Sequence, residues 1–437
     1  MSTLLLRHAT LVHEQSTQVG DVLVREGRIE QVGAQLERPA GAREIDCTGC
    51  WVGPGFVDLH THLREPGREE AETIESGARV AAVGGYTAVV AMANTEPALD
   101  NVALVSYVLD RGARTPIDVA VCGAITQGRR GELLAPMAEM AELGVRLFSD
   151  DGTGVQDPML MLRALTYVKP LGVRLAQHCE DELLAAGGSM NEGLLSSRRG
   201  LGGRSSLSEE IMVMRDIELV RHSGGALHFL HLSTARSLAL VIQARCEGLD
   251  VTCEVAPHHF TLDESACEGF DPIFKVHPPL RTKNDVTELR RGLVEGTVDA
   301  VATDHAPHAP QLKDLAFDEA PAGMLGLEHA ASLTFEALGG DACDPVRFFQ
   351  LLSRGPARVA RLRAADHRLR HSAHGAVLAA GEDANLVVFD PASRWSASRD
   401  DLHGRSTNTP YDGRAMMGRV RATIAKGNLV VDQGEPL

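Results

Sequence analysis

The chain has no excess of basic residues and no long apolar run. Its 43 Lys and Arg residues stand against 59 Asp and Glu residues, a formal net charge of −16 at pH 7. Nucleic-acid-binding surfaces normally carry a basic stripe, so this composition argues against that class of protein. No stretch approaches the roughly 18 apolar residues that a membrane span needs. A local group of Arg and His can still bind a small anionic substrate inside a pocket.

Targeting and disulfide signals are also missing. The first residues contain a three-leucine run but no cleavage-site pattern, so we expect no signal peptide. The eight cysteines are scattered, which fits free thiols in a reducing compartment and predicts a cytoplasmic location. Cys47 and Cys50 form one CxxC pair. Because no second pair completes a zinc site, we interpret these two cysteines as structural.

The chain divides into β-rich ends and an alternating middle. Residues 1–52 and 371–437 consist mainly of short β-like runs and turns. Within residues 53–370, apolar strand candidates such as Asp118–Gly123 alternate with helical stretches such as Leu207–His222. Such α/β alternation over about 300 residues is typical of a (β/α)8 TIM-like barrel.

A doubly wound open sheet is the alternative fold, but no GxGxxG fingerprint supports it. Neither an internal repeat nor a low-complexity linker interrupts the chain. The stretch Gly187–Ser206 is rich in Gly, Ser and Arg. We therefore predict that it forms a mobile surface loop.

The apolar run that begins at Trp51 ends in two histidines, His60 and His62. Its Val, Phe and Trp residues predict a strand, and Pro54-Gly55 marks a turn before it. Residues two apart on a strand point to the same face, so both imidazoles can reach one metal ion. An isolated pair of this kind is equally compatible with buried structural histidines.

Further polar residues follow apolar runs, where functional groups gather in a barrel. They are Asp150, Asp151, His178, His231 and Asp304. Each alone has a structural explanation, since Asp150-Asp151 could open a turn and Asp304 could cap a helix. Together with His60 and His62 they exceed what one metal ion needs, and they predict a two-metal site bridged by a carboxylate. Imidazole and carboxylate ligands favour zinc, with manganese, cobalt or iron as substitutes.

These motifs resemble the amidohydrolase superfamily and, within it, the dihydroorotases of the class I bacterial type. The resemblance rests on Gly55–His62, His62–Gly67, Ala93–Thr95, Phe148–Gly152, Glu254–His259, Pro278–Arg281, Val301–His308 and Gly326–Glu328. It spans nearly the whole chain. It implies a barrel over residues 53–370 and a small β-sandwich domain formed by the N- and C-terminal segments, residues 1–52 and 371–437.

The resemblance also implies roles for the site residues. His60, His62, Asp151 and Asp304 would hold one zinc ion, and Asp151, His178 and His231 the other, with Asp151 and a hydroxide as bridges. Asp304 would act as the catalytic acid and base. The substrate contacts would be His62, Arg64, Asn94, His277, His308 and the backbone at Ala322 and Gly323. A guanidinium fork such as that of Arg64 suits a planar carboxylate.

Two departures from related patterns bear on this assignment. Asp151 stands where hydantoinases and allantoinases carry a carboxylated lysine, which favours the class I dihydroorotases. His277 stands where that class usually has Asn before Pro278-Pro279. An imidazole can still donate a hydrogen bond, so activity is compatible with the change.

The implied activity is the reversible cyclisation of N-carbamoyl-L-aspartate to L-dihydroorotate in pyrimidine biosynthesis. We expect the protein to bind this small-molecule substrate, to form a homodimer and to associate with aspartate transcarbamoylase. We expect no nucleic-acid or membrane partner. One alternative is another cyclic amidase, although Arg64, Asn94 and His308 would then lack a carboxylate to bind. The other is an inactive homologue that scaffolds the transcarbamoylase, although such proteins are expected to lack the metal ligands that this chain keeps.

Overall fold

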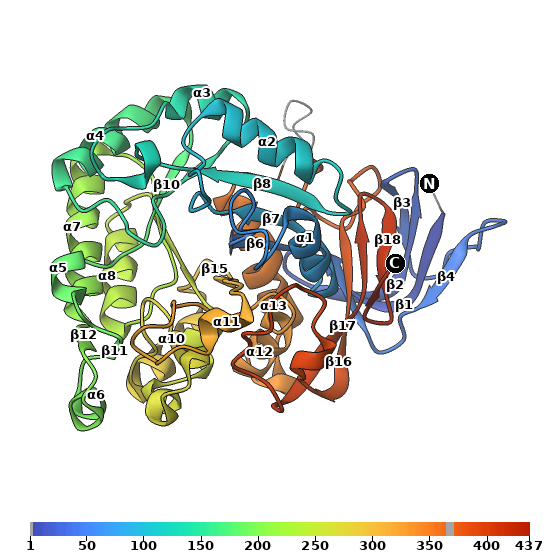
Figure 1. Cartoon of the computed structure of the whole chain (residues 1–437). Helices are drawn as coiled ribbons and strands as arrows, with labels where there is room; N and C mark the ends of the chain where they lie inside the picture. The colour runs from blue at the N-terminus through green and yellow to red at the C-terminus, as the bar shows by residue number, and fades with distance from the viewer. Residues whose placement is uncertain (1–2, 364–370) are drawn as a thin grey trace.

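The computed structural model describes residues 3–363 and 371–437. Eight parallel strands form a barrel: β6 (Phe56–Thr61), β7 (Tyr86–Ala91), β8 (Asp118–Gly123), β9 (Leu147–Phe148), β10 (Arg174–Gln177), β13 (Leu227–Phe229), β14 (Val251–Val255) and β15 (Ala300–Val301). A parallel bridge between Thr61 and His305 joins the end of β6 to the segment after β15 and nearly closes the barrel. The predicted (β/α)8 barrel is confirmed (Figure 1).

The barrel strands are apolar on both faces, which is typical of a parallel sheet enclosed by helices. Every residue of β7 is buried. Val57, Leu59 and Val90 belong to a small apolar cluster that is separate from the main hydrophobic core. The strands β9 and β10 begin only after Gly144 (φ +100°) and Gly172 (φ +64°), because these glycines still belong to turns.

Helices surround the barrel: α1 (Ile74–Val83), α2 (Val102–Gly112), α3 (Met137–Glu142), α4 (Pro158–Val168), α7 (Leu207–Ser223), α8 (Ala235–Cys246), α10 (Lys283–Glu295), α12 (Ala330–Ala337), α13 (Pro345–Phe349) and α14 (Gly355–Val359). Further short helices lie in the connections: α5 (Glu182–Ala185), α6 (Leu194–Arg199), α9 (Pro257–Thr261) and α11 (Pro310–Lys313). Side-chain caps begin several of them, for example Thr73, Asn101 and Thr234. In the described part of the chain, no helix combines the length and apolarity of a membrane span.

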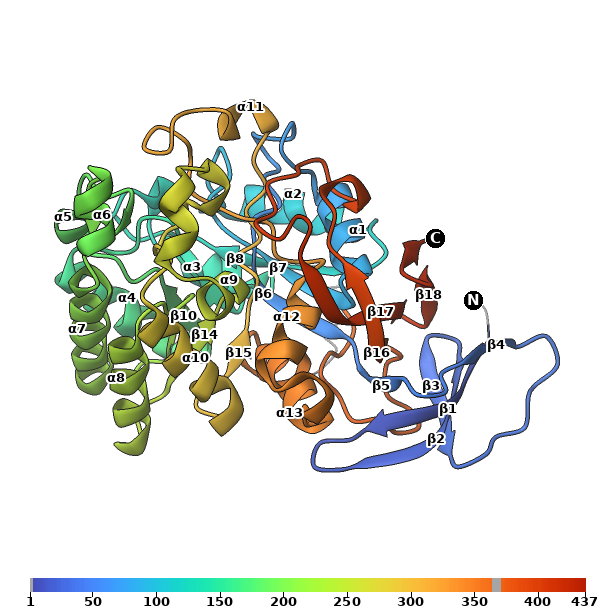
Figure 2. The ribbon, with the colours of Figure 1, turned by 90° about the horizontal axis from the view of Figure 1, so that it is seen from below.

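Both ends of the chain build one sheet beside the barrel (Figure 2). Its strands are β1 (Leu4–Val12), β2 (Thr17–Arg25), β3 (Arg28–Gly33), β4 (Arg43–Asp46), β5 (Trp51–Pro54), β16 (Leu386–Ser396), β17 (Ala415–Ala425), β18 (Asn428–Asp432) and β19 (Glu435–Pro436). The small composite β-domain is confirmed. The predicted β-sandwich is a single hydrogen-bonded sheet in the structure, because β5 pairs with β1 on one edge and with β16 on the other.

The composite sheet has a core of its own, and Cys47 and Cys50 are buried in it. Burial raises the pKa of the Cys47 thiol to about 12, so this cysteine is a poor metal ligand and packs as an apolar side chain. The predicted domain boundary after residue 52 stays a prediction, and β5 itself extends to Pro54. The boundary at residue 370 lies outside the described residues.

The stretch Gly187–Ser206, predicted as a mobile surface loop, has regular secondary structure. It contains α6 and a pair of parallel strands, β11 (Met190–Asn191) and β12 (Gly203–Arg204). The buried Arg281 organises it, because its Nη1 donates to Asn191 Oδ1 at 3.0 Å and to the Arg204 carbonyl at 2.8 Å. Composition alone does not reveal this contact, since Arg281 is distant in sequence.

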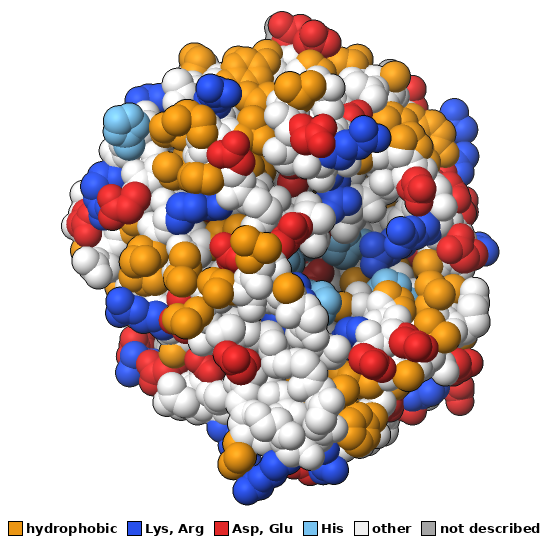
Figure 3. Space-filling model, turned by 60° about the vertical axis from the view of Figure 1, so that its left-hand side comes forward, with side chains coloured by type: hydrophobic (Ala, Val, Ile, Leu, Met, Phe, Trp, Pro, Cys, Tyr) orange, Lys and Arg blue, Asp and Glu red, His pale blue; other side chains and the backbone are white. Residues whose placement is uncertain are grey.

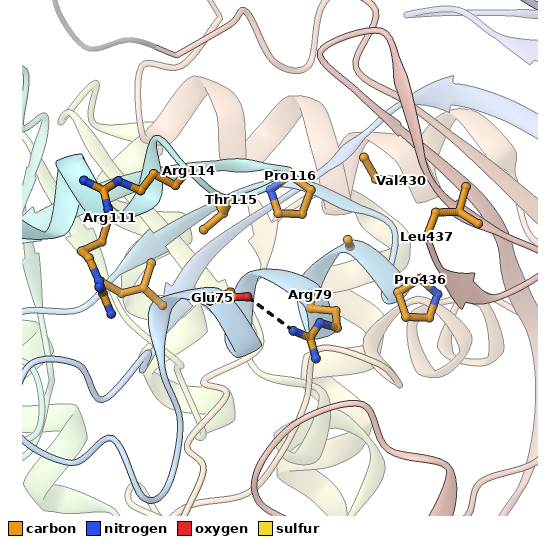
Figure 4. A pocket seen from close by; sticks show the side chains of 11 residues that line it. Glu75, Arg79, Arg111, Arg114, Thr115, Pro116, Val430, Pro436 and Leu437 are labelled. Atoms are coloured by element: carbon orange, nitrogen blue, oxygen red, sulfur yellow. Dashed lines mark ion pairs between the residues drawn. The ribbon is translucent and has the colours of Figure 1, made fainter. Parts of the chain in front are cut away.

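A groove lies where α1 and α2 meet the C-terminal strands (Figure 4). Arg79, Arg111 and Arg114 line it together with the terminal Leu437. Arg79 pairs with Glu75, which also lines the groove, at 3.7 Å. Arg111 forms an ion pair with Glu65 at 2.8 Å. The groove therefore offers mixed charges, and its lining contains none of the predicted site residues.

Candidate metal centre and active-site cavity

All the predicted metal ligands meet at the carboxyl ends of the barrel strands. His60 lies in β6 and His62 follows it, Asp151 follows β9, His178 follows β10, His231 follows β13 and Asp304 follows β15. Each is at least 94% buried, with Asp304 the most exposed at 6%. Residues far apart in the sequence converge here because parallel strands end at the same rim.

Asp151 stands in the middle of this cluster. Its Oδ2 lies 3.3 Å from His60 Nε2 and 3.6 Å from His62 Nε2. Its Oδ1 lies 3.4 Å from both His178 Nδ1 and His231 Nε2. Each pair of histidines forms, with Asp151, a set of donor atoms within 4.8 Å of one another. One carboxylate thus faces two donor sets, as a bridging ligand between two metal ions does.

The electrostatics of the cluster fit bound cations. Burial would lower the pKa of His178, but hydrogen bonds to Asp151 and Glu180 outweigh burial and raise it to about 9. Burial also opposes the charged form of His60, yet Asp151 and Glu254 hold its pKa well above the ordinary value. Among the described residues, His60 Nε2 has only ion-pair contacts, with Asp151 and Asp304, and no hydrogen bond of regular geometry, although buried polar atoms normally have one. Metal ions can replace the protons that these imidazoles would otherwise bind.

Three of the histidines are oriented by a second polar side chain, as is usual for metal-ligating imidazoles. The pairs are His60 with Glu254 (3.0 Å), His62 with Asn94 (2.7 Å) and His178 with Glu180 (3.2 Å). The sequence prediction missed Glu254 and Glu180. An acid inside the apolar strand β14 could have revealed Glu254, because an ionised group at a buried position needs a partner. Glu180 carries only the weaker signal of following His178 by two residues.

Asp304 lies against the histidines of β6. Its Oδ1 is 3.1 Å from His62 Nε2 and 3.6 Å from His60 Nε2. Its Oδ2 is 3.9 Å from the Nε2 of His258, another buried residue without an assigned role in the sequence. Burial would raise the pKa of Asp304, but the hydrogen bond with His62 and the charges of His60 and His231 outweigh burial and lower it. An ionised carboxylate at this point can accept a proton and return it.

Asp150 has a different environment from its neighbour Asp151. Asp150 Oδ1 accepts hydrogen bonds from the backbone N–H groups of Ile125 (2.8 Å) and Thr126 (3.1 Å), and Oδ2 accepts from the Thr126 hydroxyl. Asp150 therefore ties the turn after β9 to the loop after β8. Asp150 therefore has the structural role in a turn that the sequence analysis considered for the Asp150-Asp151 pair.

Positive φ angles mark three residues of the rim. They are Arg64 (φ +61°), His231 (φ +30°) and Asp304 (φ +46°). Such conformations are unfavourable for residues with a Cβ and persist where the surroundings enforce them, commonly at functional sites. The backbone strain coincides with the predicted site.

A cavity of about 260 Å³ opens beside the cluster. Figure 3 shows the hollow, with histidine and acidic side chains in its depth and Lys and Arg side chains near its mouth. All the predicted substrate-contact residues line it: His62, Arg64, Asn94, His277, His308, Ala322 and Gly323. The structure thus brings the predicted metal ligands and the predicted substrate contacts to one cavity.

The contacts of the lining residues define what each can offer a ligand. Arg64 Nε donates to the Pro307 carbonyl at 3.1 Å, and burial lowers the pKa of this guanidinium only to about 10, so it stays cationic at neutral pH. His308 Nε2 donates to the Ala322 carbonyl at 2.8 Å. A Cβ on Gly323 would lie 2.7 Å from that same His308 Nε2, so only glycine fits beside it. The wall around His308 is closely packed.

His277 also lines the cavity, next to Val276 and His178. Burial lowers the pKa of His277 to about 3, so its ring is neutral at physiological pH. Its Nε2 is buried and has no hydrogen-bond partner among the described residues. This nitrogen is available to a bound ligand in place of the amide that the family pattern usually has there.

Comparison with known proteins agrees with this geometry. Residues 49–237 match the family model described as dihydro-orotase-like. A dihydroorotase from Leifsonia xyli subsp. xyli is 44% identical over 424 residues, which covers 95% of this chain and 94% of that protein. The chain belongs to the dihydroorotase family. The dihydroorotase from Mycobacterium tuberculosis is 42% identical and covers 95% of each chain.

Solved structures show the same fold as this dihydroorotase family member. The L-hydantoinase from Arthrobacter aurescens has a TM-score of 0.88 at 23% identity and covers 100% of this chain and 98% of its own. The D-hydantoinase from a Thermus species has a TM-score of 0.82 at 25% identity, covering 99% and 96%. Family membership and the two donor sets around Asp151 together indicate a metal-dependent centre.

Proposed function

We propose that this chain catalyses the reversible cyclisation of N-carbamoyl-L-aspartate to L-dihydroorotate in pyrimidine biosynthesis. The observation that carries the proposal is the position of Arg64, which offers a guanidinium to the same cavity as His62 and Asp304. A cationic fork beside metal ligands suits an amide substrate that also bears a carboxylate. Dihydroorotases that are 41–44% identical over nearly the whole chain support the same activity.

For the metal centre we infer two zinc ions. His60, His62, Asp151 and Asp304 would hold one, and Asp151, His178 and His231 the other. Such ions supply Lewis acidity to an amide carbonyl and lower the pKa of bound water. The distances of Asp151 to both pairs of histidines support this arrangement.

The side chains of the cavity would orient the substrate and move one proton. Arg64, with Asn94 and His308, would hold the substrate carboxylate. In hydrolysis, the Asp304 carboxylate would take the proton of the attacking water and deliver it to the ring nitrogen as the C–N bond breaks. In cyclisation, the same carboxylate would take the proton of the attacking amide nitrogen and return it to the departing water.

The backbone at Ala322 and Gly323 and the His277 imidazole would contact the substrate ring. Gly323 has φ +139°, and its N–H donates to the Lys275 carbonyl at 2.9 Å, so this turn is held in place by the neighbouring loop. The free Nε2 of His277 supports a polar contact there.

The reaction stoichiometry provides the test. N-carbamoyl-L-aspartate carries two carboxylates and L-dihydroorotate carries one, so ring closure consumes a proton and releases water. We expect purified, zinc-supplied protein to reach the same product ratio from either side, with synthesis favoured about tenfold for each unit of pH decrease. Protein freed of metal is the control. An equilibrium ratio independent of pH, or no turnover after zinc addition, would contradict the proposal and favour an inactive scaffold.

Another cyclic amidase activity is the alternative, since hydantoinases share the fold. A neutral hydantoin ring has no carboxylate for Arg64. We therefore expect turnover of dihydroorotate to exceed that of hydantoin and allantoin, and the reverse order would identify a hydantoinase-like enzyme. The homodimer, the association with aspartate transcarbamoylase and the cytoplasmic location stay predictions.

A further inference from the structure

Asn408 lies in the segment that connects β16 to β17, two strands of the terminal sheet. This residue is only 4% exposed, and it is absent from the lining of the active-site cavity. Both polar atoms of its side chain nevertheless bind the two barrel loops that form one wall of this cavity. A polar side chain buried so completely needs a defined set of partners, and here the partners are functional loops.

The amide of Asn408 joins the loop after β15 to the turn at Gly323. Its Oδ1 accepts from the backbone N–H of His308 at 3.1 Å. Its Nδ2 donates to the Ala306 carbonyl at 3.0 Å and to the Gly323 carbonyl at 3.2 Å. The Asn408 carbonyl also accepts from the N–H of Leu325 at 3.2 Å. One residue of the terminal domain thus holds two barrel loops together.

The chemistry of this contact requires an amide. One acceptor and two donors on a single planar group match one N–H and two carbonyl groups. An aspartate would turn an oxygen toward both carbonyls, and a shorter hydroxyl side chain would not reach both loops. Because Ala306, His308 and Gly323 are buried, loss of the amide would leave polar backbone groups without these partners.

The wall that Asn408 supports carries predicted substrate contacts. His308 Nε2 donates to the Ala322 carbonyl at 2.8 Å, so the position of the imidazole depends on that of the turn. A Cβ on Gly323 would lie 2.7 Å from the Ala306 Cβ and from His308 Nε2, so this backbone already packs closely against both residues. A shift of the turn would therefore displace the His308 imidazole, which lines the cavity.

Other contacts fix the segment that carries Asn408, red in Figure 2, against the barrel. The Ser406 hydroxyl donates to the Ala71 carbonyl at 2.8 Å, and His403 Nδ1 pairs with Glu328 at 2.8 Å. The amide therefore reaches the cavity wall from an anchored backbone. A support of this kind keeps binding groups at a fixed spacing.

We propose that Asn408 is a positioning residue for the substrate carboxylate. It holds His308 and the backbone of Ala322 and Gly323 at the spacing that the bound ring requires. The terminal domain thus completes the substrate pocket, although none of its described residues lines the cavity. This inference rests on the proposed function, because it concerns the same substrate.

Steady-state kinetics of Asn408→Ala with zinc-supplied protein tests this role. We expect KM for dihydroorotate to rise about tenfold, the effect of a lost hydrogen bond, while kcat stays within about twofold. Metal content should not change, because none of the Asn408 side-chain hydrogen bonds reaches a predicted metal ligand. Ser406→Ala is the matched control, since Ser406 is equally buried in the same segment but binds Ala71, and it should keep the wild-type KM.

Hydrogen–deuterium exchange examines the wall without turnover. Peptides that cover residues 305–325 should exchange faster in Asn408→Ala than in Ser406→Ala, because the His308 N–H loses its acceptor and the turn loses its support. Asn408→Ser keeps a polar group at this point and serves as the milder variant where Asn408→Ala does not fold. It should show the same changes to a smaller extent.

Unchanged exchange in residues 305–325 would overturn the inference whether or not the protein is a dihydroorotase. An active wild type whose Asn408 variants lose kcat at constant KM, in proportion to unfolded protein, would also overturn it, because that pattern indicates a general structural role. A wild type without turnover would contradict the proposed function and with it the substrate named here, even where the exchange confirms that Asn408 holds the wall.

Discussion

Two buried groups of histidine and aspartate lie at opposite ends of the barrel strands, and they differ in how their polar atoms are used. At the carboxyl ends, the donor atoms around Asp151 point toward one another, and His60 Nε2 makes no hydrogen bond of regular geometry within the described residues. At the amino ends, Asp118 of β8 accepts from His374 at 2.9 Å and from the backbone N–H of Ser372 at 2.8 Å, and it pairs with Lys426 at 3.0 Å.

The comparison shows that residue type alone does not make a metal site. The amino-end group has its ionic partners inside the protein, and it joins β8 to the C-terminal segment. The carboxyl-end group has donor atoms left over, and they converge on a cavity. In barrels of this kind the carboxyl end carries function and the amino end carries stability.

The largest effect should follow from Asp304→Asn, which removes the proposed proton acceptor but keeps the shape of the side chain. We expect kcat to fall about 10³-fold, since a positioned acid–base group contributes on the order of 10²–10⁴. Steady-state kinetics together with metal analysis checks this. A variant that keeps its metal and most of its kcat would refute the role assigned to Asp304.

The neighbouring pair Asp150 and Asp151 gives the sharpest contrast within one turn. Asp151→Ala should lose most of the metal at both donor sets, because its two oxygens face both. Asp150→Ala should keep the metal but lose about 1–3 kcal/mol of stability, since it leaves buried N–H groups unpaired. Metal content by mass spectrometry and thermal unfolding separate the two. Equal metal loss in both variants would show that Asp150 also supports the metal centre directly.

A smaller effect is expected from Arg64→Ala. Loss of a hydrogen-bonded charge pair with the substrate should remove about 2–3 kcal/mol of binding free energy. This lowers kcat/KM on the order of 100-fold, mainly through a higher KM. The metal content should not change. If KM stays constant while kcat falls, Arg64 acts on the reacting groups and not on the substrate carboxylate.

The smallest effect on activity is expected from Asp118→Asn at the amino end, and this variant should keep its metal content. Burial would raise the pKa of Asp118, but His374, Lys426 and Ser372 lower it far below its ordinary value of 3.8. A lowered carboxyl pKa stabilises the fold above pH 3.8, and this stabilisation disappears as the pH falls toward the lowered value. Melting temperatures of the wild type and variant should therefore differ at pH 7 and converge in acid. A gap that widens in acid would reverse the assigned sign.

Much of the carboxyl-end group is predictable because local rules determine it. The spacing of His60 and His62 on a strand and the position of His178 directly after another strand both follow from the apolar runs before them. Glu254 and Glu180 escape such rules, because their role depends on which imidazole lies across the barrel. The order in Gly187–Ser206 escapes them for the same reason, since it depends on the distant Arg281.

The sequence by itself determined the alternation of strands and helices, the β-rich ends and the set of residues able to bind metal, because these depend on short-range pattern and chemical type. Only the tertiary structure decided how Asp150 is used, which acids orient the histidines, and which distant residue organises Gly187–Ser206. Those outcomes depend on direction and distance between segments that are far apart along the chain, and closure of the barrel sets both.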